Sequence, residues 1–285
     1  MKKMILALAL LLPAAAGAQN FGGRASVGVD YKIKKGLHLE AKEEIRTGNY
    51  KYVDNLRTSF GISYKPVRFL KVGLTYTLIN PYKAGKEITY IENAEEKTLD
   101  YYGFWAPRHR IHGDVTGIMR LGDFQFSLRE RLMMTHNTDA AMNVYQSTRN
   151  ALVLKSRLAV KYKGFMNVEP SLAFEIRTAL NEPWGQTTGE AQTTKNSNRE
   201  YYTYTHTGYT HAYNNRYRIN LGADINLSRH HSLSPYLLFD YNIDYVIDTN
   251  SADNWATKGV RLYTATTGWQ EAFNIIAGLA YVFSF

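Results

Sequence analysis

The last thirteen residues of the chain alternate strictly between two kinds of side chain. Every second residue is apolar, and the chain ends on the last of them. The positions between them, from Asn274 to Ser284, are smaller and more polar. A period of two is typical of a β-strand, in which successive side chains point to opposite faces. We therefore expect a terminal strand whose apolar face consists of Phe273, Ile275, Ala277, Leu279, Tyr281, Phe283 and Phe285.

The aromatic residues at the very end of this strand narrow the possibilities further. Tyr281, Phe283 and the terminal Phe285 resemble the C-terminal assembly signal of bacterial outer-membrane β-barrels. The resemblance implies location in the cell outer membrane of a Gram-negative bacterium, with the barrel-assembly machinery and outer-membrane lipid as partners. It also limits the roles to a pore, a lipid-modifying enzyme, or an adhesion or scaffold surface.

The N-terminal residues 1–18 have the pattern of a secretory signal peptide. Lys2 and Lys3 precede a short apolar run, and a small-x-small site ends at Ala18. This pattern predicts cleavage between Ala18 and Gln19, leaving residues 19–285 as one domain with a net charge of +7 in place of +9. The apolar run is shorter than the roughly 20 residues of a spanning helix. The chain has no cysteine, which excludes both a lipoprotein and a disulfide framework.

Between the two ends the chain consists of alternating segments of about ten residues. For example, Leu56, Phe60 and Tyr64 share one face of a segment, and Arg57 and Ser63 share the other. Nine to eleven residues suffice to cross a bilayer at a tilt. Short turns alternate with long polar loops near 80–107, 181–214 and 248–268. The predicted strands lie near 24–33, 37–47, 56–65, 70–78, 108–121, 124–134, 149–162, 167–177, 216–227, 233–244 and 273–285.

These segments predict an all-β, transmembrane, antiparallel up-and-down β-barrel of 10–12 strands. Eleven segments are counted, but single-chain bacterial barrels normally have an even number, so we expect ten or twelve, with twelve preferred. Residues 92–102 or 258–267 could be strand extensions or a missed pair of strands. The competing fold is a soluble extracellular β-sandwich, since a single alternating strand fits both.

Three segments resemble the repeated strands of the domain-of-unknown-function family 2490, which is presumed to form outer-membrane barrels. They are Leu39–Arg46 (LEAKEEIR), Phe126–Leu132 (FSLRERL) and Val168–Arg177 (VEPSLAFEIR). The resemblance extends over nearly the whole mature chain. It implies the barrel fold and its location, but no activity and no catalytic residues.

The polar faces of the predicted strands are rich in charge. One interpretation is a set of cross-strand ion pairs that fills the lumen, and the other is a channel whose basic rings select small anionic solutes. Six of these inward residues are expected to form one ion-pair network: Glu40, Glu44, Arg129, Arg131, Glu175 and Arg177. The lumen-facing candidates are Glu40, Glu44, Arg46, Arg57, Arg110, Arg120, Arg129, Arg131, Arg157, Glu169, Glu175, Arg177, Arg216, Arg218, Asp224 and Asp240.

Two glutamates depart from the pattern, because Glu43 and Glu130 fall on the predicted lipid face. A charge in the middle of the membrane costs free energy. Either a β-bulge shifts the register locally, or the two carboxylates lie near an interface.

Catalytic and metal-binding chemistry has little support in the sequence. Lipid hydrolases of this membrane pair a histidine with a serine on the lipid side, but His109 and His136 are expected near the extracellular rim and Ser156 near mid-membrane. We therefore name no catalytic residue. His230 and His231 form a predicted turn rather than a metal site. We expect His206 and His211 to be ordinary residues of the tyrosine-rich loop.

No cofactor, metal or nucleic-acid partner is expected. The basic charge of an exported chain is better explained by contact with lipopolysaccharide phosphates than with nucleic acid. The leading hypothesis is a passive or weakly anion-selective, porin-like channel, or a structural barrel. The alternatives are a phospholipase or lipid A deacylase, and a surface adhesion or scaffold protein that uses the loop around 201–213.

Overall fold

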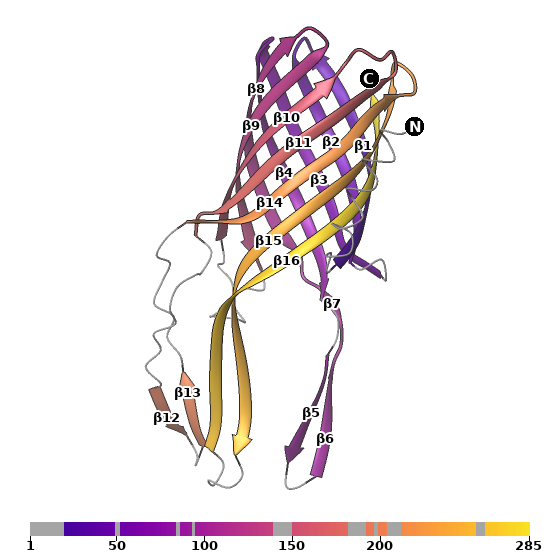
Figure 1. Cartoon of the computed structure of the whole chain (residues 1–285). Helices are drawn as coiled ribbons and strands as arrows, with labels where there is room; N and C mark the ends of the chain where they lie inside the picture. Colours follow the sequence, from indigo (N-terminus) through magenta and orange to yellow (C-terminus); the bar gives the residue numbers. More distant parts are fainter. Residues whose placement is uncertain are drawn as a thin grey trace, which may run out of the picture.

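The computed structural model describes residues 20–48, 52–83, 86–92, 95–138, 150–181, 192–196, 199–203, 212–254 and 260–285. Within these residues the chain forms a closed barrel of eleven strands (Figure 1). The barrel strands are β1 (Asn20–Lys34), β2 (Leu37–Gly48), β3 (Tyr52–Val67), β4 (Leu70–Lys83), β8 (Arg108–Leu121), β9 (Phe124–Asn137), β10 (Asn150–Tyr162), β11 (Val168–Ala179), β14 (Tyr213–Asn226), β15 (His231–Asn254) and β16 (Val260–Ser284).

The eleven strands lie within the predicted range of 10–12, but the expected even number is wrong, because the sheet closes with an odd number of strands. Consecutive barrel strands pair antiparallel, and β1 then pairs with β16 in parallel. An up-and-down barrel with an odd strand number has its first and last strands running the same way. The predicted all-β up-and-down fold is confirmed, with this one parallel pair, and the sandwich alternative is wrong.

The segments 92–102 and 258–267 add no strand to the barrel, but residues 260–267 confirm the strand-extension alternative. β5 (Lys86–Glu92) and β6 (Glu95–Tyr101) form a separate hairpin, and the two-residue β7 (Phe104–Trp105) pairs only with β4. β12 (Gln192–Asn196) and β13 (Arg199–Thr203) form a second small hairpin. Residues 260–267 belong to β16, whose ladder with β15 continues to the pair Asn254–Val260.

The two ends of the barrel differ in their connections. At one end, which we call the short-turn end, tight turns such as Lys35-Gly36 and Gly122-Asp123 join the strands. Gly36 has a φ of 80°, and a Cβ there would lie 2.6 Å from the carbonyl oxygen of Lys65, so only glycine fits. At the opposite, long-loop end, the β5–β6 and β15–β16 hairpins extend beyond the barrel (Figure 1).

The two faces of the barrel wall are inverted relative to a soluble protein. Large apolar side chains point outward and are exposed, including Val27 (59%), Phe60 (59%) and Leu128 (53%). Polar and charged side chains such as Glu44 and Glu175 are buried inside. An apolar outer belt around a polar interior is the arrangement of a transmembrane barrel. Among the described residues no helix has the length and hydropathy to span a bilayer.

Aromatic side chains gather near both ends of the outer belt. Near the short-turn end, Phe124 contacts Tyr162 at a ring-centroid distance of 5.1 Å. Near the long-loop end, Tyr82 contacts Trp105 and Tyr213 contacts Trp269, both at 5.2 Å. Aromatic girdles at both interfaces are typical of membrane barrels, because an aromatic ring with a polar edge is favoured at the headgroup level.

The C-terminal residue takes part in closing the barrel. The backbone N–H of Phe285 donates to the carbonyl oxygen of Asp30 at 2.9 Å, and the N–H of Lys32 donates back to Phe285 at 3.3 Å. The Phe285 ring packs edge-on against Tyr31, with the ring centroids 6.3 Å apart. The last residue therefore extends the β1–β16 seam.

Candidate functional site: a basic cavity in the barrel lumen

The lumen contains three cavities that follow one another along the barrel. The central cavity has a volume of about 420 Å³. It shares Arg129, Arg157 and Tyr236 with a cavity of about 520 Å³ toward the short-turn end. It shares Arg24 and Arg46 with a cavity of about 320 Å³ toward the long-loop end. Neighbouring cavities are therefore adjacent and share lining residues.

The central cavity carries a large excess of positive charge. Ten basic side chains line it, and only three carboxylates do. The alternation of each strand explains the convergence, because inward positions of ten strands meet at this depth. The basic residues are Arg24, Lys42, Arg46, Arg57, Arg110, Arg129, Arg131, Lys155, Arg157 and Arg218, and the acidic ones are Glu40, Glu44 and Glu175.

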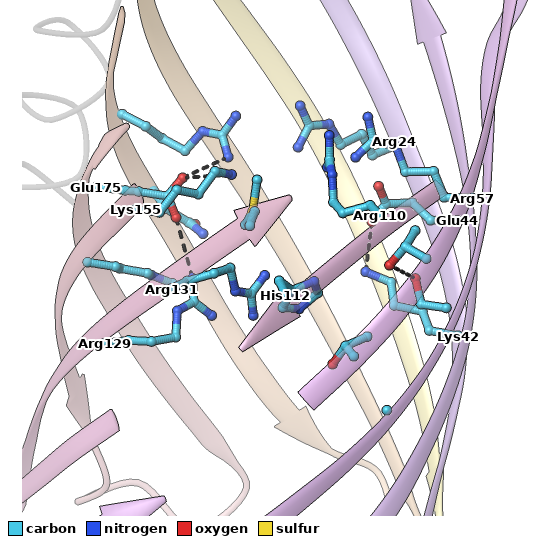
Figure 2. Close-up of a pocket in the computed structure, with 18 of the residues that line it drawn as sticks. Arg24, Lys42, Glu44, Arg57, Arg110, His112, Arg129, Arg131, Lys155 and Glu175 are labelled. Atoms are coloured by element: carbon cyan, nitrogen blue, oxygen red, sulfur yellow. Dashed lines mark hydrogen bonds and ion pairs between the residues drawn. The ribbon is translucent and has the colours of Figure 1, made fainter. Parts of the chain in front are cut away.

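On one side of the cavity, cations from three strands surround the buried carboxylate of Glu175 (Figure 2). Arg129 Nη2 lies 3.4 Å from Glu175 Oε2. Lys155 Nζ and Arg218 Nη1 each lie 3.5 Å from Glu175 Oε1. Arg218 also donates from Nε and Nη2 to the two oxygens of Asp240, at 2.5 and 2.7 Å. This fork geometry fixes the guanidinium plane.

On the opposite side, Glu44 is the centre of a second group. Its carboxylate accepts from Lys42 Nζ at 2.7 Å and from Arg46 Nε at 2.5 Å. Glu40 accepts from Ser63 Oγ at 2.9 Å and pairs with Lys71 Nζ at 3.2 Å. The acidic residues therefore anchor local groups rather than one continuous network.

Arg131 belongs to neither group. Its Nη2 donates to Asp114 Oδ2 at 2.8 Å, and its Nε donates to Asp114 Oδ1. The partner is a carboxylate on the neighbouring strand β8, directly opposite in register. Cross-strand register thus places Arg131 away from the glutamates with which it was expected to pair.

Four cavity-lining arginines, Arg24, Arg57, Arg110 and Arg157, form no ion pair with a carboxylate among the described residues. We call Arg24, Arg57 and Arg110, which lie together beside Glu44, the arginine cluster. Arg57 Nε donates to the side-chain oxygen of Asn55 at 3.0 Å, and Arg110 Nε donates to Thr135 Oγ1 at 2.8 Å. These neutral partners fix the side chains without neutralising them. Two other residues that line the same cavity carry a buried nitrogen atom without a hydrogen bond, namely His112 Nδ1 and Arg129 Nε.

The other predicted lumen residues lie above or below the central cavity. Asp224 lines the cavity toward the short-turn end, and its carboxylate accepts from Ser234 Oγ at 2.7 Å and from Lys161. Arg216 and Asp240 line the cavity toward the long-loop end. Arg177 lies opposite Lys155 and Arg216 in register.

Two predicted lumen residues lie near the short-turn end. Glu169 accepts from Lys163 Nζ at 3.0 and 3.1 Å. Arg120 is exposed next to the turn between β8 and β9.

Four further cavity residues were absent from the sequence-based set: Arg24, Lys42, Lys155 and His112. Each has the inward parity of its strand, so the alternation contained the necessary signal. Their ion-pair partners could not be predicted from the alternation, because those contacts depend on how neighbouring strands are staggered. The predicted cleavage site at Ala18 and Gln19, and His206 and His211, lie outside the described residues.

Glu43 and Glu130 both point outward from uninterrupted ladders, so the bulge explanation is wrong at both positions. Glu130 Oε2 accepts a hydrogen bond from Ser156 Oγ at 2.6 Å across β9 and β10. The two outward histidines lie six residues further along, where His109 and His136 are directly opposite in register. Six residues along a strand correspond to about 20 Å, which is too far for a histidine–serine pair.

Each outward histidine has its own hydrogen-bond partner. His109 Nδ1 lies 2.8 Å from Tyr76 Oη, and His136 Nδ1 lies 2.9 Å from Asn150 Oδ1. In the turn before β15, His230 Nδ1 lies 2.7 Å from the backbone oxygen of Ser284. Within the described residues no group of three or more histidine, aspartate or glutamate side chains is arranged to hold a metal ion.

Comparison with known proteins gives a limited result. No protein-family model and no curated protein matches the chain, so membership of family 2490 stays a prediction. Among solved structures, the chain resembles OmpT (in-vitro folded), an outer membrane protein of Vibrio cholerae. The match has 10% sequence identity and a TM-score of 0.30, and it covers 88% of this chain and 87% of that one. This TM-score is too low for any property of that protein to be transferred to this chain.

Proposed function

We propose that this chain is an integral outer-membrane β-barrel that acts as a weakly anion-selective channel for small solutes. The observation that carries the proposal is the central cavity, where ten basic side chains face three carboxylates. Rings of basic side chains in a narrow pore attract anions and repel cations. The cavities on either side of it share lining residues with it, which supports a route along the lumen.

The orientation follows from the ends of the barrel. Short turns face the periplasm in barrels of this kind, and long loops face the outside. The exposed apolar belt, the two aromatic girdles and the terminal Phe285 support insertion in the outer membrane. Family 2490 membership would agree with this location, and lipopolysaccharide and the assembly machinery would then be partners.

A purely structural lumen is less consistent with the charge distribution. A lumen filled only by ion pairs needs roughly equal numbers of positive and negative side chains, whereas Glu175 contacts three cations and Glu44 contacts two. The arginine cluster lacks such partners, and leaving unpaired charges inside a barrel costs free energy. A functional requirement for positive charge accounts for their presence.

Single-channel recording in planar bilayers tests the proposal. We expect a small conductance with preference for chloride over potassium, and we expect Arg57→Gln and Arg110→Gln to reduce that preference. Arg120→Gln is the matched control, because Arg120 is an arginine on β8 that does not line the central cavity. A folded barrel without conductance, or with cation preference, would contradict the channel.

A surface-binding role is the second candidate. It is favoured by the long-loop end, where β15 and β16 continue as a paired hairpin to Asn254 and Val260 beyond the barrel. The β12–β13 hairpin would add to this surface, and most of the predicted binding loop around 201–213 lies outside the described residues. The lipid-hydrolase alternative has no comparable support, because Ser156 bonds to Glu130 rather than to a histidine.

A further inference from the structure

The arginine cluster is placed so that its members strengthen one another's positive field. Figure 2 shows Arg24, Arg57 and Arg110 gathered on one side of the cavity, near Glu44. Neither Arg57 nor Arg110 forms an ion pair with a carboxylate among the described residues, and their Nε atoms donate to the neutral side chains of Asn55 and Thr135.

Such a cluster is incomplete without an anion. Like charges repel strongly where little water separates them. Glu44, which lies beside the cluster in Figure 2, is already engaged by Lys42 and Arg46. A counter-ion in the cavity removes the repulsion, and one with several negative oxygens removes more of it than chloride does.

The chemistry of the cavity wall favours an oxyanion. A guanidinium group presents paired N–H donors whose spacing matches two oxygens of a phosphate. The ammonium group of a lysine does not offer this paired geometry. The Nε atoms of Arg57 and Arg110 are held by Asn55 and Thr135, so the terminal nitrogens remain for a ligand. The neutral anchors therefore hold the side chains in place for binding.

A buried donor without a partner gives independent support. The Nε of Arg129 is buried and makes no hydrogen bond. Arg129 lines the central cavity with the arginine cluster, and buried polar atoms without partners are rare because they cost free energy. His112, with only 8% of its side chain exposed, lines the same cavity.

We propose that the central cavity binds a small multivalent oxyanion of the phosphate class, taken from solution, between the arginine cluster and the His112–Arg129 side. This inference rests on the proposed function and names the solute class that its lumen recognises. The volume of about 420 Å³ leaves room for such an ion together with several waters, each of which occupies about 30 Å³ in the liquid.

Isothermal titration calorimetry of the folded, purified barrel in a non-ionic detergent tests the site. Sodium phosphate is titrated at constant ionic strength against a sodium chloride background. We expect saturable binding near one ion per barrel, weakened at least tenfold in Arg57→Gln and in Arg110→Gln. Arg120→Gln should bind as the unchanged protein does. Folding of every variant is checked by heat-modifiable gel mobility.

Three results would overturn the proposal: no saturable phosphate binding, unchanged affinity in both cluster variants, or an equal loss in Arg120→Gln. If Arg57→Gln does not fold, Arg57→Lys replaces it. The lysine keeps the charge but loses the paired donors, so we expect weaker binding, and unchanged affinity would count against oxyanion recognition.

Further titrations separate the possible sources of the anion. A short-chain phosphatidic acid presented in the same detergent should bind no more tightly than inorganic phosphate. Tighter binding that requires the acyl chains would overturn the assignment to a free solute. Failure of the channel is distinguishable from failure of the site: phosphate binding without conductance leaves the site intact, and conductance without binding overturns the site alone.

Discussion

At the level of single residues, the lumen contains two classes of charge that respond differently to removal. Glu175 and Glu44 each hold two or three cations, whereas Arg57 and Arg110 rely on neutral partners. Removing a shared carboxylate leaves several cations uncompensated. Removing a member of the arginine cluster reduces repulsion instead.

This difference predicts opposite effects on stability. Glu175→Gln should lower the free energy of unfolding by about 2–4 kcal/mol, because Lys155, Arg129 and Arg218 lose their common partner. Arg57→Gln should leave it unchanged or raise it in phosphate-free buffer. Urea titration of barrels folded into neutral lipid vesicles measures both. A comparable loss in the two variants would contradict the distinction between the classes.

The outward carboxylate of Glu130 provides a second prediction. Because it lies on the apolar belt with Ser156 as its donor, Glu130→Leu should raise the free energy of unfolding by about 1–2 kcal/mol. Ser156→Ala should lower it by about 1 kcal/mol through loss of the hydrogen bond. Glu43→Leu is the matched comparison, and the same urea titration applies. A loss of stability in Glu130→Leu would contradict this and show that the hydrogen bond from Ser156 outweighs the cost of a carboxylate on the apolar belt.

At the level of strands, alternation predicted the faces well and the lengths poorly. The outward parity of Phe60, Leu128 and Leu279 follows directly from period two, and the exposure of these residues agrees. The alternation ends near residue 244, so it did not predict that β15 continues to Asn254, and residues 258–267 were only one of two places considered for an extension. The alternation placed Arg218 on the inward face but could not predict that it contacts both Glu175 and Asp240, because those contacts depend on the stagger of the strands.

The terminal strand gives the prediction for this scale. Deleting Phe285 removes two backbone hydrogen bonds to β1 and the ring contact with Tyr31. We expect the amount of folded barrel in the outer membrane to fall several-fold, as measured by heat-modifiable mobility in membrane fractions. Phe285→Tyr is the control and should assemble normally. Normal assembly of the deletion variant would refute the role of this residue in closure.

At the level of the whole molecule, the odd strand number has a consequence for the chain's first strand. The parallel β1–β16 pair places Asn20 opposite Asn274, toward the long-loop end, whereas Phe285 lies at the short-turn end. The even-number rule used for the sequence failed here because closure depends on which edges pair, and a single sequence does not reveal the partner of its first strand. The fold class followed from the alternation alone.

This topology predicts that the start of β1 is accessible from outside the cell. An epitope tag inserted immediately before Asn20 should bind antibody on intact cells, and a tag inserted after Gly122 in a short turn should bind only after permeabilisation. Heat-modifiable mobility confirms that both tagged barrels fold. Labelling of the first tag only after permeabilisation would contradict the eleven-strand closure.

The proposed channel passes anions in preference to cations, and the reversal potential under a salt gradient measures that selectivity. Purified barrel is inserted into a planar bilayer with a tenfold gradient of potassium chloride. The account predicts a reversal potential displaced toward the chloride equilibrium potential, and a smaller displacement in the Arg57→Gln, Arg110→Gln double variant. A displacement toward the potassium equilibrium potential, or no current from a folded barrel, would contradict it.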